Sequence, residues 1–327
     1  MSRRDQELSE KYQKDKRFEK VITSLNNLLS VSQNELIEEL EETYPTLHIL
    51  GAPRSGTTLV SQLISTYLPV GHINNLIAAF WKAPIYGIEL SKKLIGSKYT
   101  SNFQSDFGRT TGIDEPHEFG YFWNYHLNYD GLEQKIQNHE KNINWKQLSS
   151  LLKNMTYSYE RPIVFKSFLA GFHAEQLYRQ LNKTCFIYIK RNLVDNVLSI
   201  LKLREKLNGD KTIWGSIKPR QYEQLKSLSV YEQIVGQILC LEHEYLMQLE
   251  KVPENNKIII SYKSICENPD DFLQTIQTRF LNTQSERIPT LPNLSVKSKK
   301  VSSEVKKEIL QARNTILKLF PDLKIIK

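Results

Sequence analysis

Residues 47–58 read Leu-His-Ile-Leu-Gly-Ala-Pro-Arg-Ser-Gly-Thr-Thr, and this stretch decides the fold. The apolar run 47–50 is typical of a short buried strand. A glycine-containing loop follows at once, and Leu59, Leu63 and Ile64 then recur at helical spacing. The sequence therefore predicts a strand, a tight loop and a helix over residues 57–67.

The loop has the spacing G-x-x-x-x-G-x-[ST] of a Walker A motif between Gly51 and Thr58, with Thr57 in the place of the Walker lysine. Such a loop turns its backbone N–H groups toward a phosphate at the N-terminus of a helix. Loss of the lysine argues against a γ-phosphate ligand, while Arg54 keeps a cation in the loop. An ordinary glycine-rich turn would share the spacing.

Strand and helix patterns alternate along the rest of the chain. Strands are expected over 163–165, 185–189 and 257–262, and helices over 174–180, 194–207, 229–249 and 302–319. This alternation predicts an α/β fold with a central parallel sheet flanked by helices, whose ligands bind at the carboxyl ends of the strands.

The expected domains are a helical N-terminal extension over 1–44 and one α/β domain over 45–327, with an acceptor-binding insert at about 72–160. Within the extension, Ser32 and Glu35 resemble a capping box that would begin a second helix from Gln33 to Thr43.

Composition excludes several classes of protein. The 327 residues are 40% hydrophobic and carry a net charge of +8, which suits a globular protein with an anionic ligand. The three cysteines form no CxxC pair, so neither a disulfide framework nor a zinc site is indicated. No signal peptide or transmembrane segment is apparent, and the positive charges are dispersed. We therefore expect a cytoplasmic protein that does not bind nucleic acid.

The segment Gly-Ala-Pro-Arg-Ser-Gly-Thr-Thr-Leu over 51–59 resembles the 5′-phosphosulfate loop of the sulfotransferase family. That family uses 3′-phosphoadenosine 5′-phosphosulfate (PAPS) as its donor. The resemblance implies a fold like that of the P-loop nucleoside triphosphatases and a donor that needs no metal. It assigns the 5′ end of the donor to Arg54, Ser55, Gly56, Thr57 and Thr58.

Two further segments strengthen the resemblance. Arg191 follows the strand 185–189, and Ser199 comes eight residues later on the next helix, as in the family's site for the 3′-phosphate. Both residues can reach one anion, and the planar guanidinium can grip phosphate with two bonds. Tyr262 begins a segment that resembles the family's Tyr-Glu-x-Leu-x-x-x-Pro, with Lys263 in the place of Glu. The resemblance puts Tyr262 beside the adenine; a core aromatic at a strand end is the alternative.

Lys166 ends a predicted strand, and the resemblance implies that it contacts the transferring sulfuryl group. A surface lysine is the alternative. The general base is open, because Phe168 stands where many members carry His. Glu118 and His117 are the preferred candidates. Glu115 and His72 are the other candidates for the base. Asp114 and Glu115 are also expected to cap a helix with Pro116 in its first turn.

The sequence thus predicts a PAPS-dependent sulfotransferase acting on a carbohydrate, a lipid or another small molecule. One alternative is a P-loop kinase-like enzyme, which would need a Walker lysine and a Mg²⁺-binding aspartate. The other is a nucleotide-binding protein without catalytic activity.

Overall fold

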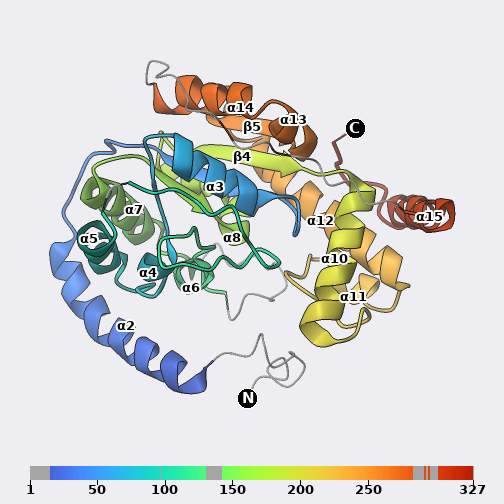
Figure 1. Ribbon diagram of the computed structural model, residues 1–327, viewed down its shortest axis with the longest axis horizontal. Helices are drawn as coiled ribbons and strands as arrows, with labels where there is room; N and C mark the ends of the chain where they lie inside the picture. The colour runs from blue at the N-terminus through green and yellow to red at the C-terminus, as the bar shows by residue number, and fades with distance from the viewer. Residues whose placement is uncertain are drawn as a thin grey trace.

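The computed structural model describes residues 15–96, 98–129, 142–282, 291, 294 and 301–326. Its centre is a parallel sheet with the strand order β2-β3-β1-β4-β5 (Figure 1). The strands are β1 (Thr46–Leu50), β2 (Gly71–His72), β3 (Ile163–Lys166), β4 (Cys185–Lys190) and β5 (Lys257–Ser261). The predicted α/β fold is confirmed. Because β1 lies between β3 and β4, the loops that leave these three strands open at the same edge of the sheet.

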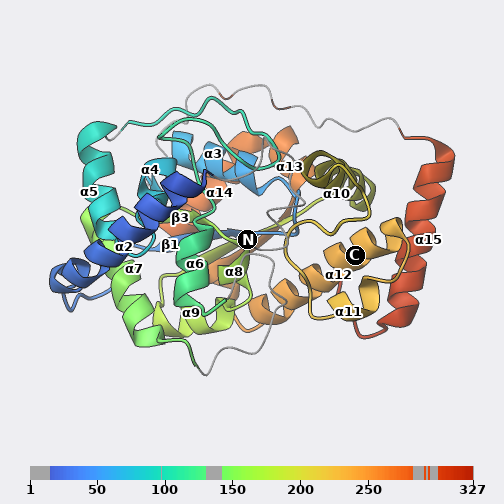
Figure 2. The same ribbon diagram turned by 90° about the horizontal axis from the view of Figure 1, so that it is seen from below.

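Helices cover both faces of the sheet. The helices are α2 (Lys16–Leu36), α3 (Thr57–Tyr67), α4 (Asn75–Ala78), α5 (Pro84–Leu94), α6 (Gly120–His126), α7 (Trp145–Tyr159), α8 (Phe168–Gly171), α9 (Ala174–Gln180), α10 (Leu193–Asn208), α11 (Tyr222–Leu225), α12 (Val230–Leu249), α13 (Tyr262–Glu267), α14 (Pro269–Ile276) and α15 (Ser303–Leu319). Of these, α3, α13 and α14 lie on one side of the sheet, and α6, α8, α9 and α12 lie on the other (Figure 2). A 3₁₀ turn, η3 (Glu254–Asn256), precedes β5, and a π-helical turn, η4 (Gln277–Leu281), follows α14. Within these ranges no helix is both long and apolar enough to cross a membrane.

Alternate residues of β1 point to opposite faces and feed two cores. Leu47 and Ile49 pack with α3, α13 and α14, which lie together in Figure 1. On the other face, Leu50 joins a core built mainly from the helices between β2 and β4 and from α12. His48, on that same face, stacks between Phe165 and Phe186, and its burial lowers its pKa to about 3. A neutral imidazole therefore sits in the core under the sheet.

The predicted second helix in the N-terminal extension is wrong. α2 runs without a break through Ser32 to Leu36, and the chain is not helical from Ile37 to Thr43. Gln33, expected to start the second helix, is instead buried on α2. Beyond the helix, the backbone of Glu38 bonds to the side chain of Asn154 on α7, which holds the chain extended. Residues 1–14 of the predicted helical extension lie outside the described residues.

The predicted helix start at Asp114–Pro116 is also wrong. α6 begins at Gly120, after Phe119 in a left-handed conformation with φ 54°. Glu115 caps no helix, because its buried carboxylate accepts hydrogen bonds from Gln62, Ser101 and the backbone of Asn102. The carboxylate thus ties the loop before α6 to α3. Strand β2, only two residues long, was not predicted.

Candidate active site

The loop between β1 and α3 is shaped by two glycines. Gly56 caps α3 with φ +109°, and a Cβ there would lie 2.2 Å from the ring of Tyr262. A Cβ on Gly51 would lie 2.9 Å from the carbonyl oxygen of Ile189. Tyr262 and the backbone of Ile189 therefore pack so closely against these two glycines that a side chain at either position would clash.

The strand β4 and the helix α10 hold this loop in place. Asn196 on α10 donates a hydrogen bond of 2.7 Å to the carbonyl of Pro53. Arg191, just after β4, donates one of 2.8 Å to the carbonyl of Arg54, whose φ is +68°. Asn196 and Arg191 thus fix two consecutive carbonyls of the loop 51–58.

The residues predicted for the two phosphate sites meet in space. Arg54 Nε donates to Ser199 Oγ at 3.2 Å, and the guanidinium of Arg191 lies 5.0 Å from the ring centre of Tyr262. Burial, and then the charge of Arg191, lower the pKa of Arg54. Two guanidinium groups so close together repel each other, and a bound anion relieves that repulsion. Burial raises the pKa of Tyr262 to about 12, so its ring is neutral.

Lys166 is buried, with 2% of its side chain exposed, so the surface-lysine alternative is wrong. Its Nζ donates to Thr58 Oγ1 at 2.9 Å and to the carbonyl of Gly108 at 3.1 Å. It also forms an ion pair of 3.0 Å with Glu118. Lys166 therefore joins the end of β3 to the first turn of α3 and to the loop before α6.

Sequence analysis missed the turn that carries Gly108. Asp106 and Arg109 exchange backbone hydrogen bonds of 2.8 and 3.0 Å, and the φ angles of Phe107 and Gly108 are +52° and +92°. This is a two-residue turn of the I′ kind. The Phe107 ring centre lies 5.2 Å from the guanidinium of Arg54. The Asp-x-Gly spacing could have predicted a turn, but not its place against Arg54 and Lys166.

The four base candidates occupy different surroundings. Glu118 contacts Lys166, and 39% of its side chain is exposed, so a ligand can reach it. His117 accepts the backbone N–H of Phe119 on Nδ1 at 2.9 Å, which ties its ring to its own turn. Glu115 is buried, and its carboxylate is held by the three donor residues named above. Of these four residues, Glu118 is the one in contact with Lys166.

His72 lies at the sheet edge in β2, where its Nε2 donates to the carbonyl of Asp114 at 2.7 Å. Burial lowers its pKa. It lines a cavity of about 660 Å³ together with Tyr99 and Tyr159. The lining of this cavity includes neither Lys166 nor any residue of the loop 51–58, so His72 belongs to separate surroundings.

Known proteins resemble this chain in sequence pattern and in fold. Residues 45–284 match the family model described as the sulfotransferase family. The solved structure of sulfotransferase STF9 from Mycobacterium avium is similar, with 13% identity, a TM-score of 0.51, and coverage of 94% of this chain and 77% of that one. For sulfotransferase STF1 from Mycobacterium tuberculosis H37Rv the values are 12%, 0.51, 97% and 88%. These structures share the fold. No curated protein matches the sequence.

Proposed function

The chain belongs to the sulfotransferase family, and we propose that it moves a sulfuryl group from PAPS to a hydroxyl or amine of a small acceptor such as a carbohydrate or a lipid. One observation carries the proposal. Arg54, Thr58, Lys166 and Glu118 come together at the carboxyl ends of β1 and β3. This cluster combines buried positive charge with a reachable carboxylate.

The residues present fit a donor with two separate anionic groups. The backbone of the loop 51–58, the N-terminus of α3 and Arg54 suit the 5′-phosphosulfate. Arg191 and Ser199 suit the 3′-phosphate, and we assign the adenine to Tyr262, whose ring lies beside Arg191. Within the loop, the buried hydroxyl of Ser55 has no hydrogen-bond partner among the described residues, which marks a polar atom suited to a ligand.

The chemistry follows from where the charges lie. The acceptor oxygen attacks sulfur while the bond from sulfur to the bridging oxygen of the 5′-phosphate breaks. Glu118 takes the acceptor's proton, which is worth about 10²–10⁴-fold in rate. Lys166 and Arg54 stabilise the negative charge that moves onto the bridging oxygen, and one such donor is worth about 10²–10³-fold.

The residues around the site indicate where the acceptor binds and what the reaction requires. The segment between β2 and β3 brings Glu118 and the aromatic helix α6 to the site, and we assign acceptor binding to it. Arg54 and Lys166 supply the positive charge, so the reaction needs no metal. The three cysteines are free and buried, which suits a reducing compartment such as the cytoplasm.

An acceptor screen tests the function. The protein is incubated with PAPS labelled in its sulfuryl group and with panels of sugars, lipids and phenols, with and without EDTA. Label should appear in an acceptor that gains the mass of one sulfuryl group, and EDTA should not change the rate. Transfer of phosphate from ATP with a strict Mg²⁺ requirement would instead support the kinase-like alternative. Donor binding without any transfer would support the non-catalytic one.

A further inference from the structure

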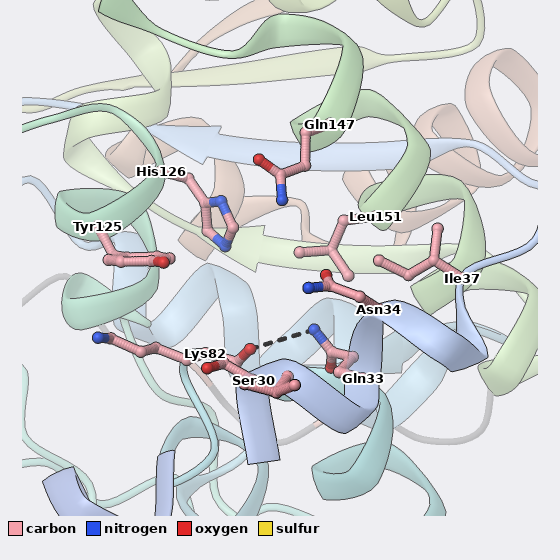
Figure 3. A pocket seen from close by; sticks show the side chains of 10 residues that line it. Ser30, Gln33, Asn34, Ile37, Lys82, Tyr125, His126, Gln147 and Leu151 are labelled. Atoms are coloured by element: carbon pink, nitrogen blue, oxygen red, sulfur yellow. Dashed lines mark hydrogen bonds between the residues drawn. The ribbon is translucent and has the colours of Figure 1, made fainter. Parts of the chain in front are cut away.

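The N-terminal helix α2 is attached to the protein through buried polar side chains and through Ile22, which packs against the main core. Its fully buried side chains are Asn26 and Gln33. Asn26 donates to the carbonyl of Ala79 at 2.7 Å and accepts the N–H of Lys82 at 2.8 Å. Gln33 donates to the carbonyl of Lys82 at 3.1 Å (Figure 3) and accepts the N–H of Ile85 at 3.0 Å. These four hydrogen bonds fix the rotation of α2 about its own axis.

On the opposite face of α2, a stripe of four apolar side chains is open to solvent. We call it the outer stripe; it consists of Phe18, Val21, Leu28 and Val31, which are 57%, 59%, 71% and 69% exposed. At 100° per residue these side chains fall within an arc of about 140°. α2 lies at the margin of the molecule (Figure 1). Apolar side chains exposed singly are normal, whereas four on one face of a helix form a candidate contact surface.

Charge is distributed unevenly along the helix. Lys16, Arg17 and Lys20 are exposed in the first turns of α2, where Asp15 caps the helix and Glu19 accepts a hydrogen bond from Tyr121 on the inner side. Glu35 is exposed in its last turn, and Glu38 and Glu39 are exposed just beyond it. Arg17 and Glu35 are 18 residues apart, about five turns of 3.6 residues, so they share a face with the outer stripe. The stripe is therefore positive at one end and negative at the other.

We propose that the outer stripe is a dimer interface, on which α2 of a second copy of this chain lies antiparallel. A two-fold axis pairs the same surface on both copies. With the axis at the level of Asn26, Arg17 lies opposite Glu35 of the second copy, and Val21 lies opposite Val31. Both ends of the pair then join unlike charges, and the two helix dipoles also run in opposite directions. An anionic membrane would instead repel the acidic end of α2, so a second copy suits this surface better.

Sedimentation equilibrium of the full chain tests the interface. The wild-type protein should be dimeric at micromolar concentration. Leu28→Glu should raise the dimer dissociation constant at least tenfold, because it places a charge in the stripe. Leu310→Glu, at a 45%-exposed leucine of α15, is the matched control and should leave the constant unchanged. A wild-type protein that stays monomeric at micromolar concentration overturns the proposal. Binding of that monomer to anionic vesicles would point to a membrane as the occupant instead.

A charge exchange tests the antiparallel arrangement without touching the apolar residues. Arg17→Glu alone and Glu35→Arg alone should each weaken self-association about tenfold, because like charges then face each other twice. An equimolar mixture of the two variants should recover dimers of wild-type affinity, since each partner supplies the charge that the other lacks. Thermal unfolding confirms that both variants are folded. A mixture that associates no better than either variant alone overturns the pairing of Arg17 with Glu35.

Discussion

The ammonium group of Lys166 lies 3.0 Å from the carboxylate of Glu118, and the two residues come from different sides of the site. Lys166 ends β3, and Glu118 stands two residues before α6. The pair therefore joins the sheet, which holds the phosphate loop, to the segment that we assign to the acceptor. On this account Lys166 acts on the donor side of the reaction and Glu118 on the acceptor side.

Replacing Lys166 should affect turnover more than donor binding. Lys166→Met keeps most of the side-chain volume and removes the charge. We expect kcat to fall about 10²–10³-fold, because the contact of Lys166 strengthens as charge moves onto the bridging oxygen. Steady-state kinetics and the dissociation constant of the donor measure both effects. Lys263→Met, at a 71%-exposed side chain on α13, is the control. A large loss of donor affinity with normal kcat would contradict the assigned role.

The base should be identified by pH profiles of two variants. Glu118→Gln should lower kcat about 10²–10⁴-fold and abolish the decline of activity at low pH, since a glutamine cannot take the proton. His117→Ala should keep that decline and most of the rate, because the ring of His117 is tied to its own turn. If His117→Ala instead loses the decline and Glu118→Gln keeps it, the assignment of the base is wrong.

Gly56 should tolerate no side chain. Gly56→Ala puts a Cβ 2.2 Å from the ring of Tyr262 and strains a backbone with φ +109°. Gly209→Ala is the matched control, because φ is also positive there, at +72°, but no atom lies within 4 Å. The control should cost about 1 kcal/mol in the free energy of unfolding, from backbone strain alone. Gly56→Ala should cost more and also weaken donor binding, as measured by denaturant unfolding and calorimetry. Equal costs would show that Tyr262 does not pack on this loop.

His48 should make the fold sensitive to acid. Its pKa is about 3 in the folded state and near 6.5 in the unfolded chain. The unfolded state therefore binds the extra proton between these values, and stability falls as pH drops below about 6.5. At pH 5 the loss should be about 2 kcal/mol relative to pH 7. His48→Gln should remove this part of the pH dependence in denaturant unfolding. As a control, His243→Gln, at a more exposed histidine, should leave the pH dependence of stability as it is in the wild type. If His48→Gln also leaves it unchanged, the role of His48 is refuted.

The fold could be predicted because its signals are local. The apolar runs of β1, β3, β4 and β5 lie directly before loops and helices whose periodicity is clear, and α3 and α9 begin and end at the predicted residues. The short β2 could not be predicted, since two residues carry no period. The predicted break in the helix near Ser32 was wrong, because hydrogen bonds of Gln33 with Lys82 and Ile85, around the start of α5, keep α2 continuous.

Motifs of fixed spacing could predict that the residues we assign to the donor lie together, whereas no motif marks the residues we assign to the acceptor. Arg54 and Ser199 lie far apart in the sequence, yet each belongs to a motif, and the structure joins them. Gly108 contacts Lys166 through its backbone carbonyl, which no pattern of side chains can reveal. The choice among the base candidates likewise depends on which carboxylate reaches Lys166, and that is set by the path of the loop before α6.

The most direct test of the central claim is calorimetric binding of adenosine 3′,5′-bisphosphate and of 5′-AMP to the same protein. Two separate phosphate sites require the bisphosphate to bind far more tightly. Arg191→Ala should then weaken bisphosphate binding by about 2–3 kcal/mol, roughly 30- to 150-fold. It should weaken binding of 5′-AMP less, because toward that ligand Arg191 acts only through its hydrogen bond to the carbonyl of Arg54 in the loop. Equal affinity of the wild-type protein for the two nucleotides would contradict a site built for PAPS.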